Sequence, residues 1–275
     1  MLLRLGYDIR FEIPSPIAMV ALLHVHPSRA ADLRAPDEIC IEPWTPVETF
    51  LDHSGNRCTR FVAQQGALRL SNSTLLQDPG FLDRVNYNAR ELPVQELSHD
   101  ILRYLLNSRY CEVDRFATIA TELFGGIPRG WGRVQAICNW VHSNVSFGYQ
   151  FACPTKTALD VYFERVGVCR DFQHLAVTLC RALHIPARYA TGYLGDIRVP
   201  AVPTLMDFSA WFEVYLEDRW WTFDARHNQP RYGRILMATG RDASDVAMTT
   251  SFGMANLTQF TVVSEEVNQE NAFSA

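Results

Sequence analysis

Residues 167–172 of this 275-residue chain read Gly-Val-Cys-Arg-Asp-Phe, and they open the segment that says most about the fold. Between residues 169 and 183, apolar side chains recur three or four positions apart, which is the spacing of a helix with one buried face. Pro186 follows soon after, and proline cannot continue a helix. Asp171 falls in the first turn, where a negative charge suits the helix dipole. The pattern therefore predicts a helix that begins at Cys169.

The predicted position of Cys169 bears on its chemistry. Unpaired backbone N–H groups and the positive end of the helix dipole favour the thiolate, and cysteines so placed have pKa values of roughly 3.5–7.5 rather than about 8.5. The thiolate is the nucleophilic form. Cys180, deep in the same helix, is expected only to pack. We therefore expect a depressed pKa and a reactive thiol at Cys169.

The segment 211–224 predicts a β-hairpin, because two runs of strand-forming residues flank a polar turn at 217–219. A two-residue loop would place Ser209 on the same face as Asp224, diagonally across at roughly 7–8 Å. A loop one residue longer would instead bring His227 opposite Ser209 and turn Asp224 to the other face. Both registers remain open at this point.

These motifs resemble the core of the transglutaminase-like superfamily. The resemblance runs from about Leu97 to Asp224, with the segments 167–172, 181–193 and 210–224 in family order and at family spacing. It implies an α+β, papain-like fold in which a Cys-His-Asp triad transfers an acyl group from an amide. The N-terminal half is similar to the β-region that accompanies this core in bacterial proteins.

Carried over position by position, the resemblance puts the nucleophile at Cys169 and the orienting acid at Asp224. The family's histidine falls on Ser209, whose hydroxyl cannot take up a proton near neutral pH. Loss of a general acid/base typically costs 10²–10⁴-fold in rate. His227, three residues after Asp224, is a candidate substitute base if its loop turns back toward the cleft. Its alternative role is at the surface or as a cap.

The remaining histidines have no cysteine or carboxylate context that indicates catalysis. His174 lies off the apolar stripe of its helix, so we expect it to be exposed. The others are expected to serve packing or the surface: His24, His26, His53, His99, His142 and His184.

The periodicity of the sequence changes near residue 95. Residues 1–95 contain short alternating runs between turn residues, which predicts a β-sandwich-like N-terminal domain. Residues 96–264 are predicted to form the transglutaminase-like core, with C-terminal strands that include 260–263. Residues 265–275 are predicted to be a frayed polar tail. Further helices are predicted at 95–106, 115–124, 132–144 and 159–165.

Composition narrows the class of protein. With 48% hydrophobic and 12% aromatic residues, the chain can bury a large core. Seven cysteines without paired spacing suggest reduced thiols. The sequence contains no CxxC or HExxH pattern, so neither a metal nor another cofactor is expected. Basic residues are scattered and the net charge is −5, so no nucleic-acid partner is expected. Peptide or protein is the substrate that the resemblance implies.

The sequence also bears on location. Asp8 and Arg10 interrupt the opening apolar residues early, and no run approaches 18 apolar residues. We therefore expect a cytoplasmic protein without a membrane partner. The sequence does not indicate an oligomeric state.

Two function hypotheses follow. The first is a cysteine enzyme that acts on amide bonds, as an amidase, peptidase or acyltransferase, through a Cys169 thioester. The second is a catalytically impaired relative that binds peptide or protein in the same cleft. Ser209 favours the second hypothesis. The presence of both Cys169 and Asp224 favours the first.

Overall fold

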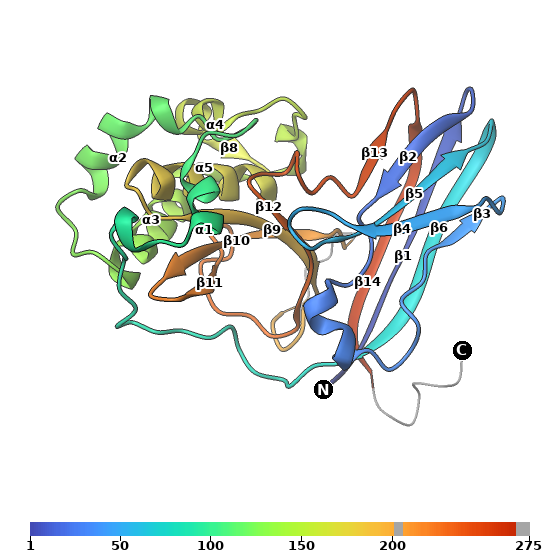
Figure 1. Ribbon diagram of the computed structural model, residues 1–275, viewed down its shortest axis with the longest axis horizontal. Helices are drawn as coiled ribbons and strands as arrows, with labels where there is room; N and C mark the ends of the chain where they lie inside the picture. Colours follow the sequence, from blue (N-terminus) through green and yellow to red (C-terminus); the bar gives the residue numbers. More distant parts are fainter. Residues whose placement is uncertain (201–205, 268–275) are drawn as a thin grey trace.

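Two antiparallel four-stranded sheets occupy one side of the molecule, and a core of helices around a third sheet occupies the other (Figure 1). The computed structural model describes residues 1–200 and 206–267. The α+β class and the β-rich N-terminal region that precedes the core are as the sequence predicts.

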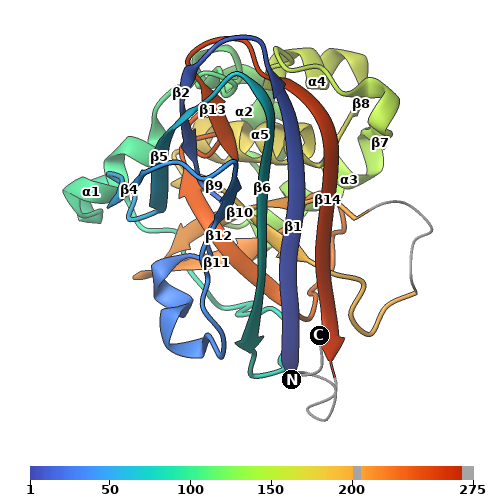
Figure 2. The ribbon, with the colours of Figure 1, turned by 90° about the vertical axis from the view of Figure 1, so that its right-hand side faces the viewer.

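The first sheet of the β-region has the strand order β14-β1-β6-β3, with β1 in the middle of the long strands (Figure 2). The second sheet has the order β13-β2-β5-β4. Alternate side chains of β1 and β2 are buried in a shared apolar cluster, as expected for two sheets packed face to face. The strands are β1 (Leu2–Ile13), β2 (Ile17–Ala21), β3 (Cys40–Glu42), β4 (Val47–Leu51), β5 (Arg57–Ala63), β6 (Gly66–Gln77), β13 (Thr249–Ser251) and β14 (Asn256–Val267).

The C-terminal strands belong to this β-region and not to the core, which corrects the grouping made from the sequence. β14 pairs with β1 from Leu2↔Val267 to Glu12↔Asn256, and β13 pairs with β2. Pairing between the two ends of a chain leaves no local pattern in the sequence. Residues 265–267 extend β14, whereas the rest of the predicted tail lies outside the described residues. The boundary near residue 95 remains a prediction.

The helices of the core lie close to the predicted positions, with one exception. They are α1 (His99–Leu102), α2 (Ala117–Phe124), α3 (Trp131–Asn144), α4 (Ala158–Glu164) and α5 (Cys169–Ala182). The predicted helix at 95–106 is instead broken into α1 and two short 3-10 turns, Val94–Glu96 and Arg103–Leu105. The break occurs where Leu97 and Ser98 adopt extended conformations.

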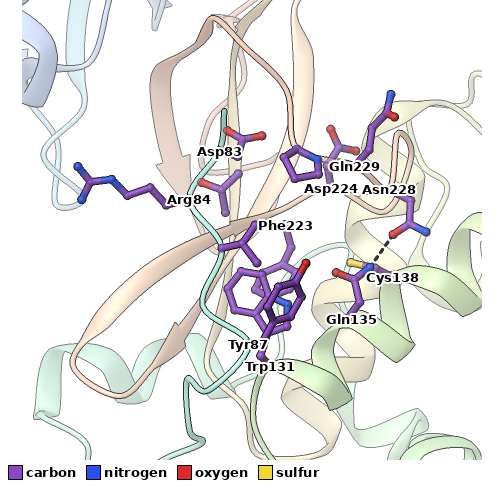
Figure 3. Close-up of a pocket in the computed structure, with 13 residues that line it drawn as sticks. Asp83, Arg84, Tyr87, Trp131, Gln135, Cys138, Phe223, Asp224, Asn228 and Gln229 are labelled. Carbon is purple, nitrogen blue, oxygen red and sulfur yellow. Dashed lines mark hydrogen bonds between the residues drawn. The ribbon is translucent and has the colours of Figure 1, made fainter. Parts of the chain in front are cut away.

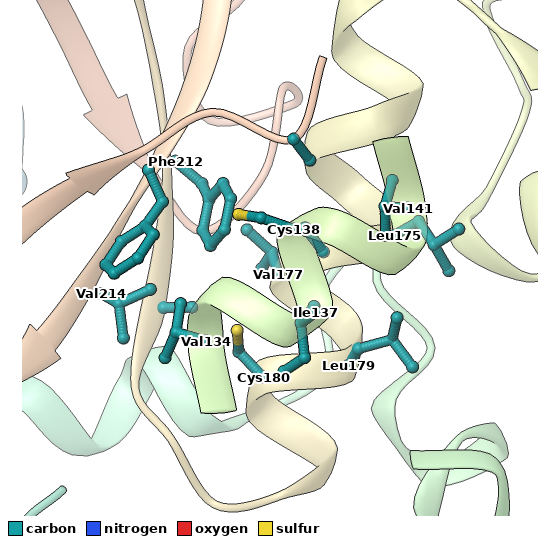
Figure 4. Packing of buried hydrophobic residues seen from close by; sticks show 14 of the residues in the cluster. Val134, Ile137, Cys138, Val141, Leu175, Val177, Leu179, Cys180, Phe212 and Val214 are labelled. Atoms are coloured by element: carbon teal, nitrogen blue, oxygen red, sulfur yellow. The ribbon is translucent and has the colours of Figure 1, made fainter. Parts of the chain in front are cut away.

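Helix α5 is the centre of the core. It packs on the sheet β11-β10-β9-β12 on one side and on α2, α3 and α4 on the others. Buried side chains of α3, α5 and β10 meet there, including Cys138, Cys180 and Phe212 (Figure 4). The strands are β9 (Ala187–Leu194), β10 (Ser209–Leu216), β11 (Arg219–Phe223) and β12 (Arg234–Gly240), and a short parallel pair, β7 (Ser146–Phe147) and β8 (Val166–Gly167), leads into α5.

The β-region and the core are joined through Phe208, the residue before β10. Its buried ring makes edge contacts with Tyr7, Tyr193 and Phe260, at centroid distances of 6.1, 5.1 and 5.8 Å. Tyr7 and Phe260 lie on β1 and β14, whereas Tyr193 lies on β9. The start of β10 is therefore held against the β-region.

Among the described residues, no helix has both the length and the apolar character needed to cross a membrane.

Candidate active site

Cys169 is the first residue of α5, as predicted. The carboxylate of Asp171 fixes this end of the helix: it accepts a hydrogen bond from the backbone N–H of Val168 at 2.9 Å and one from the Arg170 guanidinium at 2.9 Å. Gly167 makes the turn possible, since a Cβ there would lie 2.7 Å from the Cβ of Asp171. The backbone N–H of Cys169 has no acceptor within the helix, because the first four N–H groups of a helix lack one.

The hairpin of β10 and β11 has the register that the sequence predicts for a two-residue loop. Phe212 pairs with Phe223 and Leu216 with Arg219, so Glu217 and Asp218 form the loop. Of the two registers left open by the sequence, this one places Ser209 and Asp224 on the same face. β11 ends at Phe223, so Asp224 lies one position beyond the strand.

A tight turn after β11 brings His227 back onto Asp224. One carboxylate oxygen, Oδ1, accepts the backbone N–H groups of Arg226 and His227, each at 3.0 Å. The other, Oδ2, lies 2.9 Å from Nδ1 of the His227 ring. A carboxylate can only accept, so Nδ1 carries the proton and Nε2 is the basic nitrogen of the neutral ring.

Two further side chains hold Asp224 in place. Arg234 donates from Nη2 to Oδ2 at 3.1 Å and also pairs with Asp83, and Gln173 of α5 donates to Oδ1 at 3.3 Å. Burial by itself would raise the pKa of Asp224, but the hydrogen bond from His227 and the charge of Arg234 outweigh it. The pKa of Asp224 is therefore held well below its usual range, and the group is a carboxylate at neutral pH.

The turn that carries His227 is also fixed from α3. Gln135 donates to the side-chain oxygen of Asn228 at 2.9 Å (Figure 3). Asn228 in turn donates to the side-chain oxygen of Asn139 at 2.9 Å. A small cavity of about 80 Å³ lies at this place, lined by Asp224, Asn228 and Trp131 among others (Figure 3). The position of His227 is therefore set by the hairpin on one side and by α3 on the other.

Sequence reasoning missed Gln173, Arg234 and Asp83. Gln173 had a signal, because it is a polar residue one helical turn after Cys169 and so lies on the same side of the predicted helix. The structure buries it completely. Arg234 and Asp83 had none, because Arg234 reaches Asp224 from β12 and Asp83 in turn bonds Arg234 from a segment far away in the sequence.

Cys169 lies where two cavities meet. One, of about 440 Å³, is lined by Cys169 and Ser209 together with apolar and aromatic residues such as Tyr189 and Val246. The other, of about 390 Å³, is lined by Cys169 and Ser209 together with His227. Within the described part of the chain, the hydroxyl of Ser209 makes no hydrogen bond. Three of the four predicted site residues, Cys169, Ser209 and His227, thus line one cavity, and the fourth, Asp224, is bonded to His227.

Burial opposes ionisation of the Cys169 thiol. It raises the pKa to about 11, although the charge of Arg226 and the N–H groups of Ala210 and Arg170 act in the opposite direction, and Asp207 adds to the increase. The depressed pKa expected from the helix end alone is therefore wrong for this site, because desolvation outweighs the helix terminus. The resting thiol is neutral, and a base must remove its proton.

His174 is buried, which contradicts the expectation of an exposed side chain. Its ring stacks on Tyr110 at 4.9 Å between centroids, and its Nε2 accepts the backbone N–H of Ala243 at 3.1 Å. Burial lowers the pKa of His174 to about 3, so the ring is neutral. The expectation was wrong because α5 is covered on every side, so that even residues outside its apolar stripe are buried.

Across residues 1–200 and 206–267, no three histidine, cysteine or acidic side chains come together in an arrangement that could hold a metal ion.

Comparison with known proteins identifies the family. The family model of the transglutaminase-like superfamily matches residues 117–225. The crystal structure of a Cytophaga hutchinsonii protein, provisionally described as a cysteine protease, is 32% identical in sequence. It superposes with a TM-score of 0.85 over 98% of this chain and 91% of that one. The chain belongs to the transglutaminase-like superfamily.

Two other similarities are more limited. An uncharacterized protein of Mycobacterium leprae is 30% identical over 117 residues, which are 42% of this chain and 42% of that relative. The periplasmic domain of TgpA from Pseudomonas aeruginosa is 16% identical, with a TM-score of 0.42 over 82% of this chain and 88% of that one.

Proposed function

We propose that this protein is a cysteine amidase or peptidase that cleaves amide bonds of peptides or proteins through a thioester on Cys169. The observation that carries the proposal is the geometry of His227. Its Nδ1 is bonded to Asp224 at 2.9 Å, while its ring lines the same cavity as Cys169. Membership of the superfamily supports a peptide or protein substrate.

In this proposal, His227 takes the role that the superfamily gives to a histidine at position 209. Nε2 is the general base for the thiol, and the Asp224 carboxylate orients the ring and stabilises the imidazolium that forms. Such a base is needed, because burial keeps the Cys169 thiol protonated near neutral pH. Ser209 lines the cavity beside the nucleophile and does not carry the proton.

The reaction has two halves. The Cys169 proton moves to Nε2 of His227 while the sulfur attacks the amide carbonyl, and the Cys169 backbone N–H donates to the oxyanion. The C–N bond then breaks as the imidazolium protonates the leaving amine, which leaves a thioester. Water, deprotonated by His227, attacks the thioester carbonyl, and the acid product leaves as the proton returns to the thiolate. A primary amine in place of water would give transamidation.

An amide-hydrolysis screen of the native protein and the Cys169→Ala variant tests the proposal. A library of fluorogenic peptide amides reports cleavage, and a fluorescent primary amine in parallel reactions reports transfer. We expect hydrolysis that falls by at least about 10³-fold in Cys169→Ala. Cys40→Ala is the matched control, because this exposed thiol lies on β3 of the β-region. Activity that persists in Cys169→Ala would contradict the mechanism.

Ser209 favours one second candidate, a cleft that binds peptides without turnover. Under this alternative, native protein and the Cys169→Ala variant would bind the same peptides with equal affinity by calorimetry. No product would then accumulate with the native protein at any pH between 5 and 9.

A further inference from the structure

Asp207 lies at the junction of the two cavities that contain the candidate nucleophile, Cys169. It precedes Phe208 and Ser209, and it lines both of the cavities that meet at Cys169. The anchoring of the Phe208 ring between β1, β9 and β14 fixes the backbone at this point. Asp207 therefore borders both of the cavities through which a group can approach the sulfur.

The Asp207 carboxylate has no ion-pair partner in the part of the chain that the structure describes. No nitrogen of a basic side chain there lies within 4.0 Å of it. The two stretches outside that part, 201–205 and 268–275, contain no lysine, arginine or histidine and cannot supply one. Arg226 is close enough to act on its charge, but the Arg226 guanidinium lies over the Phe147 ring at 3.9 Å.

An unpaired Asp207 carboxylate beside Cys169 opposes the ionisation of the thiol that the proposed reaction requires. Burial raises the pKa of Asp207, and its negative charge in turn raises the pKa of the Cys169 thiol. A cation bound to the carboxylate opposes both increases in pKa, because it favours the charged form of Asp207 and offsets the negative charge that acts on the thiol. Tyr149 lines the cavity that also contains His227, so an aromatic ring stands near the acid. A carboxylate with an aromatic face is a combination that holds ammonium groups.

We infer that Asp207 forms a binding subsite for an alkylammonium group of the substrate, either a lysine side chain or a free peptide amino terminus, next to the amide under attack. The inference rests on the proposed function, because it describes what the Cys169 site accepts. It adds a recognition element that the Cys-His-Asp arrangement does not require.

The subsite is tested through the reaction of Cys169 with methanethiosulfonates, which needs no knowledge of the substrate. The aminoethyl reagent carries an ammonium group, and the propyl reagent is its neutral counterpart of similar size. The rate of modification at Cys169 is followed by peptide mass spectrometry for each reagent. The rate with the aminoethyl reagent is divided by the rate with the propyl reagent, and this ratio is divided by the same ratio measured with glutathione to give the normalised ratio. A change in the thiol pKa affects both reagents alike, so the normalised ratio reports the subsite alone.

We expect a normalised ratio of about ten or more in the native protein, since hydrogen bonds to charged groups are the stronger kind. Asp207→Asn should bring it close to one, and Asp207→Glu should retain most of it. Asp218→Asn is the matched control, because it removes the same charge from the exposed hairpin loop. A native ratio near one, or a ratio that Asp207→Asn leaves unchanged, would overturn the inference.

Peptide binding to the Cys169→Ala variant separates the two sources of the ammonium group. One peptide pair differs by lysine against norleucine beside the target amide, and the other by a free against an acetylated amino terminus. The pair whose charged member binds more tightly, with a preference lost in Asp207→Asn, identifies the source. No preference in either pair would contradict the assignment to peptides. Because this assay measures binding, a failure of hydrolysis would refute the proposed function without deciding the subsite.

Discussion

Moving the histidine from position 227 to position 209 is the perturbation that the structure makes most informative. His227→Ala removes the proposed base and should lower kcat/KM by about 10²–10⁴-fold. The remaining partners of Asp224 are unaffected, because Arg234, Gln173 and the backbone N–H groups of the turn still bind it. The variant therefore keeps an ionised acid in place, with one free acceptor position.

Extended by one pair beyond Phe212↔Phe223, the register of the hairpin puts positions 209 and 224 on one face as diagonal neighbours, for which the expected separation is roughly 7–8 Å. An imidazole at position 209 spans most of this separation. The cavities that Ser209 lines, of about 440 and 390 Å³, have room for it. The double variant Ser209→His/His227→Ala should therefore recover at least about tenfold in kcat/KM over His227→Ala, a part of the contribution of a general base.

The assay is hydrolysis of the best fluorogenic amide from the screen, with folding checked by thermal denaturation. Ser209→Gln/His227→Ala is the control, because glutamine adds similar bulk without a basic nitrogen. Native-like activity in His227→Ala would refute the assignment of the base. A folded histidine variant that is no more active than the glutamine control would refute the inferred relation between positions 209 and 224.

Three further predictions concern stability and its pH dependence. Gly167→Ala should destabilise the fold by about 1–3 kcal/mol in urea denaturation, because its Cβ would lie 2.7 Å from that of Asp171; a change below about 0.5 kcal/mol would contradict the tight helix entry. Phe208→Ala should lower the free energy of unfolding by about 3–5 kcal/mol, and Phe208→Leu should lower it much less. Equal losses in the two variants would show that the ring does not join the β-region to the core. The folded-state pKa of Asp224 is lowered, so its contribution to stability is present above the unfolded pKa of about 3.9 and is lost as the pH falls below it. Urea denaturation between pH 6 and pH 3 should therefore show a shallower loss in Asp224→Asn than in the native protein, and parallel curves would argue against the lowered pKa.

The sequence predicted the parts of the site that depend on local pattern. The start of α5 at Cys169 followed from helical spacing and a first-turn acid, and both are properties of neighbouring residues. The hairpin followed from strand propensity, but its register depends on one loop residue, and only the structure places Phe212 opposite Phe223.

What the sequence left out depends on contacts between distant segments. The pairing of β14 with β1 joins the two ends of the chain, and the ion pairs of Arg234 bring together two acids from separate segments. The burial of His174 and the raised pKa of Cys169 have a common cause. Both residues lie on a helix enclosed on all sides, and the spacing of apolar residues along one helix does not reveal how many elements cover it.

The pH dependence of Cys169 alkylation by iodoacetamide, in the native protein and in His227→Ala, tests the central claim most directly. If His227 deprotonates the thiol, the native protein should react with iodoacetamide at a pH well below that at which a buried thiol ionises without a base. In His227→Ala, the rise of the rate with pH should move toward the thiol pKa of about 11, and the rate at pH 7 should fall by about 10²-fold or more. Profiles that coincide in the two proteins would contradict the claim that His227 and Asp224 activate Cys169.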